Sequence, residues 1–158
     1  PNFTEDMPKW LGEARISENA NFELNKNNEL IWRSGTWFDG TWQNGIWKDG
    51  IWKKGKWKNG LWERGSWKGG TWKNGEWKDG EWIDGTWENG LWKDGQWFNG
   101  LWKNGTWKDG LWKNGTWEDG LWKGGVWEKG KWKNGKIINN KGRKMNSKVP
   151  PNKFLFNN

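Results

Sequence analysis

The side chains that could carry out chemistry in this chain are carboxylates, lysines and tryptophans, because two of the usual catalytic types are missing. The 158 residues include no His and no Cys, which removes the commonest general base, the thiolate nucleophile and the imidazole and thiolate metal ligands. The 19 Asp and Glu residues are spread evenly, so no two carboxylates stand out as an acid and base couple. We therefore expect a protein that is not an enzyme and needs no cofactor.

Aspartates form the most regular row of possible metal ligands. Calcium prefers oxygen ligands, but calcium-binding loops place several acidic residues within a few positions of one another. The aspartates of this chain are spaced more widely, and each stands alone before a glycine. We expect no metal site at these residues, which are Asp39, Asp49, Asp79, Asp84, Asp94, Asp109 and Asp119.

Positive charge is concentrated at the C-terminal end of the sequence. The chain has 27 Lys and Arg residues and a net charge of +8. Nine of them lie in residues 129–158, which contain no acid, so residues 1–128 hold 27 − 9 = 18 basic and 19 acidic residues. A protein that binds nucleic acid along its whole surface is basic throughout, and this one is not. The tail alone could hold an anionic partner such as nucleic acid, or could simply be a solubilising end. Its candidate residues are Lys141, Arg143, Lys144, Lys148 and Lys153.

Tryptophan recurs at every fifth position, three residues before a glycine, as in LWKNGTWKDG at 101–110. The pattern x-W-x-x-G runs without interruption over residues 31–135, which is 105/5 = 21 units and accounts for all 22 tryptophans except Trp10. Exposed indoles could stack on bases or sugars. Only 32% of the residues are hydrophobic, however, so a folded chain must place its large aromatic side chains inside. We expect the indoles to form the core, with backbone carbonyls or Asn and Asp side chains accepting their N–H groups.

A five-residue period excludes an α-helix, whose apolar residues recur near every 3.6 positions and which glycine destabilises by about 1 kcal/mol per residue. Two β architectures remain. One is a meander of hairpins turning at Asn-Gly and Asp-Gly. Two-residue turns at both ends would leave three-residue strands, whereas alternating hydrogen-bond directions require an even number. The other is a solenoid in which each unit forms one side of a coil, and we favour this architecture.

The array resembles the pentapeptide-repeat family, whose units carry a small inward residue, an outward residue, a large inward residue and two more. On residues 105–109, Gly105 takes the small inward place, Thr106 points outward, Trp107 points inward, and Lys108 and Asp109 form the corner. The array departs from the family by using Trp for Leu or Phe and Gly for Ala. The resemblance implies an all-β, four-sided solenoid, here with about five coils and a height of roughly 25 Å. The glycine would make room for the larger indole.

Two weaker resemblances accompany this one. The segment GEWKDG at 75–80 locally resembles the hairpin half of MORN repeats, which keeps a MORN-like antiparallel meander as the alternative fold. The Trp-Gly units also look like Trp/Phe-Gly repeats of large tailed phages, which would suit a virion component.

The sequence divides into three regions. Residues 1–30 lack the repeat and are expected to cap the apolar end of the array, with a short helix at 10–16. Residues 31–135 are the array. Residues 136–158 begin with a degenerate unit, in which Ile137 takes the Trp place and Asn140 the Gly place, and continue as the basic tail.

Leucine precedes tryptophan only in every second unit, which gives a ten-residue period. In a four-sided coil this would place Leu91 and Leu111 on one face and Leu101 and Leu121 on the opposite face. Exposed apolar stripes commonly mark partner surfaces, although duplication of a ten-residue unit would also produce the period.

These observations favour a non-enzymatic structural or assembly protein. We expect a rigid rod with a Trp core that docks to a protein partner or to itself through apolar ridges and a basic tail. The alternative is a binding module for nucleic acid or glycan that uses exposed Trp and Lys. The chain has no apolar run long enough to span a membrane and no N-terminal signal pattern, so we expect no membrane association, and the compartment stays open.

Overall fold

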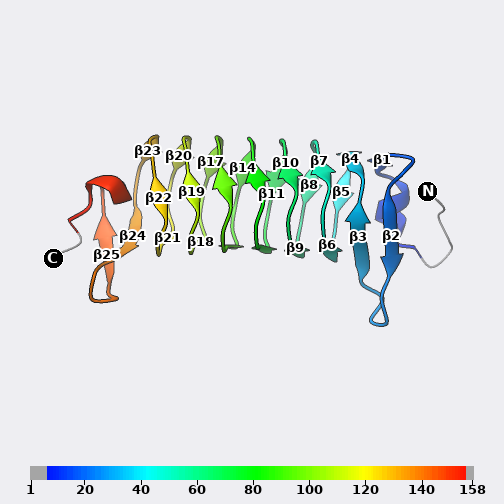
Figure 1. The fold of residues 1–158 in the computed structure, drawn as a ribbon, viewed down its shortest axis with the longest axis horizontal. Helices are drawn as coiled ribbons and strands as arrows, with labels where there is room; N and C mark the ends of the chain where they lie inside the picture. Colours follow the sequence, from blue (N-terminus) through cyan, green and yellow to red (C-terminus); the bar gives the residue numbers. More distant parts are fainter. Residues whose placement is uncertain (1–6, 156–158) are drawn as a thin grey trace.

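Strands that are 15 residues apart in the sequence lie side by side in the computed structural model, which describes residues 7–155 (Figure 1). Trp67, for example, pairs in parallel with Trp52 on one side and Trp82 on the other. A 15-residue coil contains three pentapeptides, so the 21 units form seven coils. The predicted β-solenoid is confirmed. The four-sided coil is wrong, because each coil has three sides, and the hairpin meander is wrong, because the array strands are parallel.

Each side of the coil contributes strands to one sheet that runs along the rod. Sheet 1 consists of β1 (Arg15–Ile16), β4 (Thr36–Asp39), β7 (Ile51–Trp52), β10 (Ser66–Trp67), β13 (Glu81–Trp82), β16 (Gln96–Trp97), β19 (Leu111–Trp112) and β22 (Val126–Trp127). Sheet 2 consists of β5 (Thr41–Trp42), β8 (Lys56–Trp57), β11 (Thr71–Trp72), β14 (Thr86–Trp87), β17 (Leu101–Trp102), β20 (Thr116–Trp117) and β23 (Lys131–Trp132). Sheet 3 consists of β2 (Asn21–Leu24), β3 (Leu30–Ser34), β6 (Ile46–Trp47), β9 (Leu61–Trp62), β12 (Glu76–Trp77), β15 (Leu91–Trp92), β18 (Thr106–Trp107), β21 (Leu121–Trp122), β24 (Gly135–Ile138) and β25 (Lys144–Ser147).

The tryptophans fill the inside of the rod. All 21 array indoles are at most 7% exposed. Trp87 stacks on Trp72 and Trp102 of the adjacent coils, with ring centroids 4.7 and 4.8 Å apart and planes within 6°. Trp87 contacts Trp82 and Trp92, the tryptophans of the preceding and following units, edge to face, with ring centroids 5.9 Å apart and planes at 72–73°. Both arrangements are favoured by the charge distribution of aromatic rings, so the core is three stacks of indoles that contact one another edge to face.

The size of the indole explains why the coil has three sides. Three indoles in edge-to-face contact close around the axis of the rod. A fourth side would move the rings away from the axis and leave a void, which protein interiors avoid because it forfeits contacts. The predicted count of four came from a family with smaller inward side chains.

The indole N–H groups point at the corner of the next coil. Six of them donate to the backbone carbonyl of the residue 17 positions later, at 3.1–3.2 Å, as Trp87 does to Asn104. Twelve other buried Nε1 atoms form no hydrogen bond within the part of the chain that the structure describes. The acceptors are backbone carbonyls, one of the two kinds expected, and the same corner lies near the unpaired groups: an ideal Cβ on Gly85 would be 3.2 Å from Trp67 Nε1.

Glycine is required because the coils approach closely at the corners. At Gly110, φ is 121°, a conformation that residues with a side chain rarely adopt. A Cβ there would lie only 2.5 Å from the carbonyl oxygen of Gly95 in the preceding coil and 3.2 Å from Trp92 Nε1. The space that glycine provides therefore belongs mainly to the neighbouring backbone and only partly to the indole.

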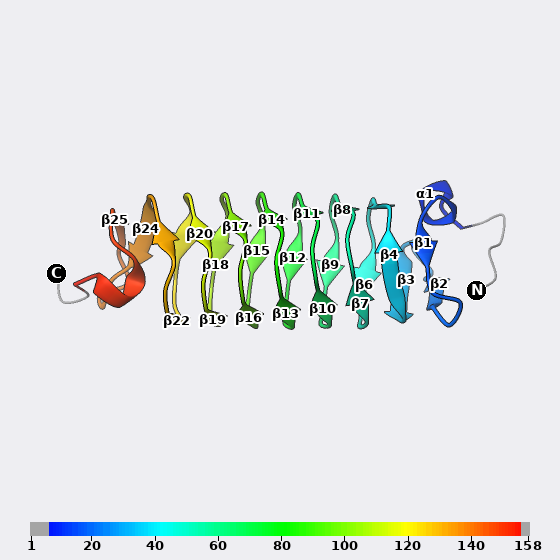
Figure 2. The ribbon, with the colours of Figure 1, turned by 90° about the horizontal axis from the view of Figure 1, so that it is seen from above.

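The N-terminal end of the rod is covered by antiparallel strands and a short helix (Figure 2). Strand β1 pairs antiparallel with β4, and β2 with β3. The helix α1 (Lys9–Gly12) brings Trp10 against Trp42, with ring centroids 5.3 Å apart. The predicted helix at 10–16 is thus shorter than expected, because Arg15 and Ile16 pair with the first coil. Residues 1–6 of the predicted cap lie outside the described residues.

The C-terminal end is closed by the segment that follows the array. Ile137 takes the Trp place, pairs with Trp122 and is fully buried. Strand β25 then pairs antiparallel with β24, Trp132 donates to the Ser147 carbonyl at 3.0 Å, and the 3-10 turn η1 (Pro151–Lys153) follows. The basic tail is therefore part of the fold up to residue 155, and residues 156–158 lie outside the described part.

Burial of the indoles makes a spectroscopic prediction. We expect tryptophan emission to be blue-shifted from that of the urea-unfolded chain, and iodide to quench it far less in the folded protein. Trp10, which is partly exposed, would supply most of the residual quenching, and Trp10→Phe is the control that removes it. Strong quenching that persists in this variant would show that the array indoles are accessible to solvent.

Candidate interaction surfaces

The residue before each tryptophan forms the outer surface of the rod. In every two-residue strand of the array, the tryptophan is buried and this preceding residue is at least partly exposed, because successive side chains of a strand point to opposite faces. Parallel pairing at 15-residue intervals places these residues in three rows, one on each sheet.

The three-sided coil separates the four predicted leucines. Leu91 and Leu121 lie on sheet 3, two coils apart, whereas Leu101 lies on sheet 2 and Leu111 on sheet 1. The predicted pair of opposed ridges is therefore wrong. Units that are 20 residues apart return to the same face of a four-sided coil but fall on different faces of a three-sided one.

Sheet 3 carries four outward apolar side chains that are at least partly exposed, against three on sheet 1 (Ile51, Leu111 and Val126) and one on sheet 2. Its row contains Leu91 and Leu121 and also Ile46 and Leu61, which the sequence analysis did not single out. Polar residues Glu76 and Thr106 alternate with the leucines. A 15-residue grouping of the sequence would have revealed the row. Sheet 2, by comparison, has one apolar residue among its seven outward positions: Thr41, Lys56, Thr71, Thr86, Leu101, Thr116 and Lys131.

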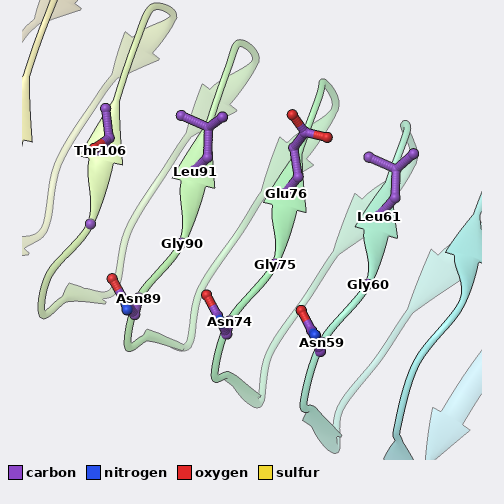
Figure 3. Close-up of a pocket in the computed structure, with 11 residues that line it drawn as sticks. Asn59, Gly60, Leu61, Asn74, Gly75, Glu76, Asn89, Gly90, Leu91 and Thr106 are labelled. Atoms are coloured by element: carbon purple, nitrogen blue, oxygen red, sulfur yellow. The ribbon is translucent and has the colours of Figure 1, made fainter.

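A shallow groove runs along sheet 3 (Figure 3). A strip of glycine backbone forms its middle, at Gly60, Gly75 and Gly90. A row of asparagines borders one side, at Asn59, Asn74 and Asn89. The outward row borders the other side, at Leu61, Glu76, Leu91 and Thr106. The groove therefore offers apolar side chains, amides and bare backbone in a repeat that follows the coils.

The corner that follows sheet 3 carries both signs of charge. Lysines occupy positions 48, 78, 93, 108 and 123, and aspartates occupy positions 49, 79, 94 and 109. Ion pairs link adjacent coils on this side. They join Lys48 Nζ to Glu63 Oε2 at 3.4 Å, Arg64 Nε to Asp49 Oδ2 at 3.3 Å, and Lys93 Nζ to Glu76 Oε1 at 2.9 Å. Opposite charges in neighbouring strands are mutually stabilising, so this edge of sheet 3 is close to neutral.

The aspartates have a structural role at the corners. Each of the seven accepts a hydrogen bond at Oδ1 from the N–H of the following glycine, at 2.8–2.9 Å. This local bond between side chain and backbone satisfies a backbone donor where the chain changes direction. Within residues 7–155 no three acidic side chains come together as metal ligands.

All five predicted anion-binding residues of the tail are exposed. Lys141 and Arg143 lie in the loop between β24 and β25, where their backbone N–H groups donate to Asn139 Oδ1 at 2.9 Å. Lys144 begins β25, and Lys153 ends η1. Lys148 Nζ donates to Asn134 Oδ1 at 3.1 Å. The structure thus brings the predicted tail residues to the closing end of the rod.

Comparison with known proteins adds no assignment. Neither the protein-family models nor the curated protein sequences give a match. A solved structure assigned as an acetyltransferase, from Desulfovibrio desulfuricans G20, aligns with 3% identity and a TM-score of 0.22. The alignment covers 87% of this chain and 36% of that one, a similarity too low to carry an argument. Among the described residues, no helix has the length and apolar character needed to cross a membrane.

Proposed function

We propose that this chain is a non-enzymatic structural protein, a rigid rod that assembles side by side with a second copy of itself through sheet 3. The observation that carries the proposal is the outward row of sheet 3, where Ile46, Leu61, Leu91 and Leu121 share one face. A row of four apolar side chains on one sheet, against three on sheet 1 and one on sheet 2, is typical of a docking surface.

A second copy fits this face because its side chains repeat at the same distance. Adjacent coils are separated by the stacking distance of the indoles, 4.7–4.9 Å, and a partner with another repeat would lose register along the rod. The leucines occur at every second coil, with Glu76 and Thr106 between them. In a two-fold symmetric dimer, the leucines of one copy can pack at the positions between the leucines of the other copy, where Glu76 and Thr106 lie.

Charge does not oppose a second copy. The corner beside sheet 3 carries Lys78, Lys93 and Lys108 in one row along the rod and Asp79, Asp94 and Asp109 in the next, so neither sign dominates there. Residues 1–128 are nearly neutral overall, which removes long-range repulsion between the bodies of the rods.

The burial of the tryptophans weakens the alternative function. A binding module that stacks bases or sugars on exposed indoles requires accessible rings, and the array indoles are at most 7% exposed. Of that alternative, only binding through the exposed lysines is compatible with the buried indoles.

Sedimentation velocity at concentrations up to several hundred micromolar tests self-assembly. We expect the wild-type rod to form a dimer and Leu91→Lys/Leu121→Lys, both on sheet 3, to sediment as a monomer with dimerisation weakened at least tenfold. Each lysine would bury a charge at the interface, which costs more than about 1.4 kcal/mol, the equivalent of a factor of ten.

The matched control is Leu101→Lys/Leu111→Lys, which makes the same substitutions on sheets 2 and 1 and should dimerise normally. A wild-type protein that stays monomeric at the highest concentration would contradict the proposal. Equal loss of the dimer in both variants would show that sheet 3 is not the docking face.

A further inference from the structure

One end of the rod carries a concentration of positive charge without any acid. Residues 129–158 hold eight lysines and one arginine and no Asp or Glu. All nine side chains are exposed. They are Lys129, Lys131, Lys133, Lys136, Lys141, Arg143, Lys144, Lys148 and Lys153.

The fold gathers these charges at the closing end. Lys131 lies on β23, the last strand of sheet 2, and Lys136 lies on β24. The hairpin loop that holds Lys141 and Arg143 extends away from the rod at the same end (Figure 1). Because β25 pairs back onto β24, Lys144 lies opposite Ile138, beside the last coil.

The charges at this end are not compensated. In the body of the rod, carboxylates are interspersed among the lysines, and a few of them form ion pairs between coils, as Glu63 does with Lys48 and Asp39 with Lys54. None of the nine end charges forms an ion pair with any residue in the range 7–155. Like charges in one place repel each other, and a polyanion would remove that repulsion.

Protection of an open sheet edge explains only part of this pattern. Strand β23 has no further strand beside it within residues 7–155, and lysines on an edge strand discourage pairing with other chains. That role suits Lys131 and Lys133. It does not require the charges of Lys141 and Arg143 in the hairpin loop or of Lys153 in η1.

We propose that the closing end of the rod binds nucleic acid through its phosphate backbone. Lysine ammonium groups bind phosphates as point charges, and the indoles nearest this end, Trp127 and Trp132, are only 4% and 7% exposed. With no exposed tryptophan to stack on bases, binding distinguishes neither base sequence nor single from double strands. This site lies at the C-terminal end of sheet 3, on β24, β25 and the loop between them, and follows the apolar row, which ends at Leu121 beside Lys136. The rod therefore has one surface for a second copy and an adjoining one for a polyanion.

Fluorescence anisotropy with the full chain and labelled 20-nucleotide single-stranded and duplex DNA of mixed sequence tests the proposal. We expect log Kd to rise with log salt concentration with a slope of roughly 4, as about four or five neutralised phosphates would give. The variant Lys141→Glu/Arg143→Glu/Lys144→Glu should bind at least tenfold more weakly at low salt, with a slope lower by roughly 2 to 3.

The control is Lys68→Glu/Lys73→Glu/Lys103→Glu, which makes the same change in net charge at exposed lysines of the body and should bind within about threefold of wild type. Unchanged near-ultraviolet circular dichroism confirms that both variants fold, and a Lys→Gln version of the end variant should show a smaller loss of the same kind. No binding at low salt, or equal losses in both Glu variants, would overturn the proposal. Tighter binding of poly-glutamate than of DNA would overturn it in favour of an acidic protein partner.

Discussion

Replacing Trp87 with alanine is expected to lower the free energy of unfolding by about 3–5 kcal/mol, the loss typical of removing a large buried aromatic side chain. Trp87 is completely buried and contacts four other indoles. Its N–H also donates to the Asn104 carbonyl at 3.1 Å. Because neighbouring coils stabilise one another, a cavity in the middle of the array weakens the coils on both sides.

Urea unfolding followed by far-ultraviolet circular dichroism measures this loss. The control is Phe98→Ala, which removes an aromatic side chain from a corner, where it contacts the Lys113 ammonium with 5.0 Å to the ring centroid. We expect that control to lose no more than about 1 kcal/mol. Similar losses in the two variants would mean that the indole stacks contribute little to stability.

Replacing Gly110 with alanine is expected to cost about 2–4 kcal/mol, although it adds only one methyl group. The positive φ of 121° accounts for about 1–3 kcal/mol of strain. The new Cβ would also meet the Gly95 carbonyl, which accepts a hydrogen bond from the Leu111 N–H at 2.9 Å. Weakening that bond would cost about 0.5–1.5 kcal/mol more.

A glycine outside the repeat position is the matched control for Gly110. Gly69 has no positive φ, and the nearest atom to a Cβ there is the Lys53 carbonyl oxygen at 3.4 Å, an ordinary contact distance. Gly69→Ala should therefore change stability by less than about 1 kcal/mol in either direction. If the two alanine variants unfold at the same urea concentration, close approach of the coils is not what requires glycine.

The periodic sequence predicted the architecture of the rod correctly and its cross-section incorrectly. A tryptophan every five residues with a glycine three positions later excludes a helix and places one large side chain inside at each side of a coil. The number of sides depends on how the indoles meet around the axis, and no single unit contains that information. A regular feature of the sequence does mark the 15-residue coil: asparagine precedes glycine at positions 44, 59, 74, 89, 104 and 134, and elsewhere in the array only at positions 99 and 114. The positions of leucine alone follow a ten-residue period instead.

The candidate surfaces show the same division. The exposure and uncompensated charge of Lys141, Arg143 and Lys144 follow from a stretch of sequence without acids, and the structure adds that they lie on a folded cap. The grouping of Ile46 and Leu61 with Leu91 and Leu121 could not be obtained without the coil length, since a change from four sides to three reassigns every outward residue beyond the first coil.

Composition and spacing by themselves determined that this chain is an all-β repeat protein with its indoles inside and its positive charge at one end, because those properties depend on which residues are present and on their order within a unit. Only the tertiary structure decided between a solenoid and a hairpin meander, which outward residues share a sheet, and why glycine is needed at each corner. These depend on contacts between coils, where the packing of three indoles and the approach of one backbone to the next fix the geometry.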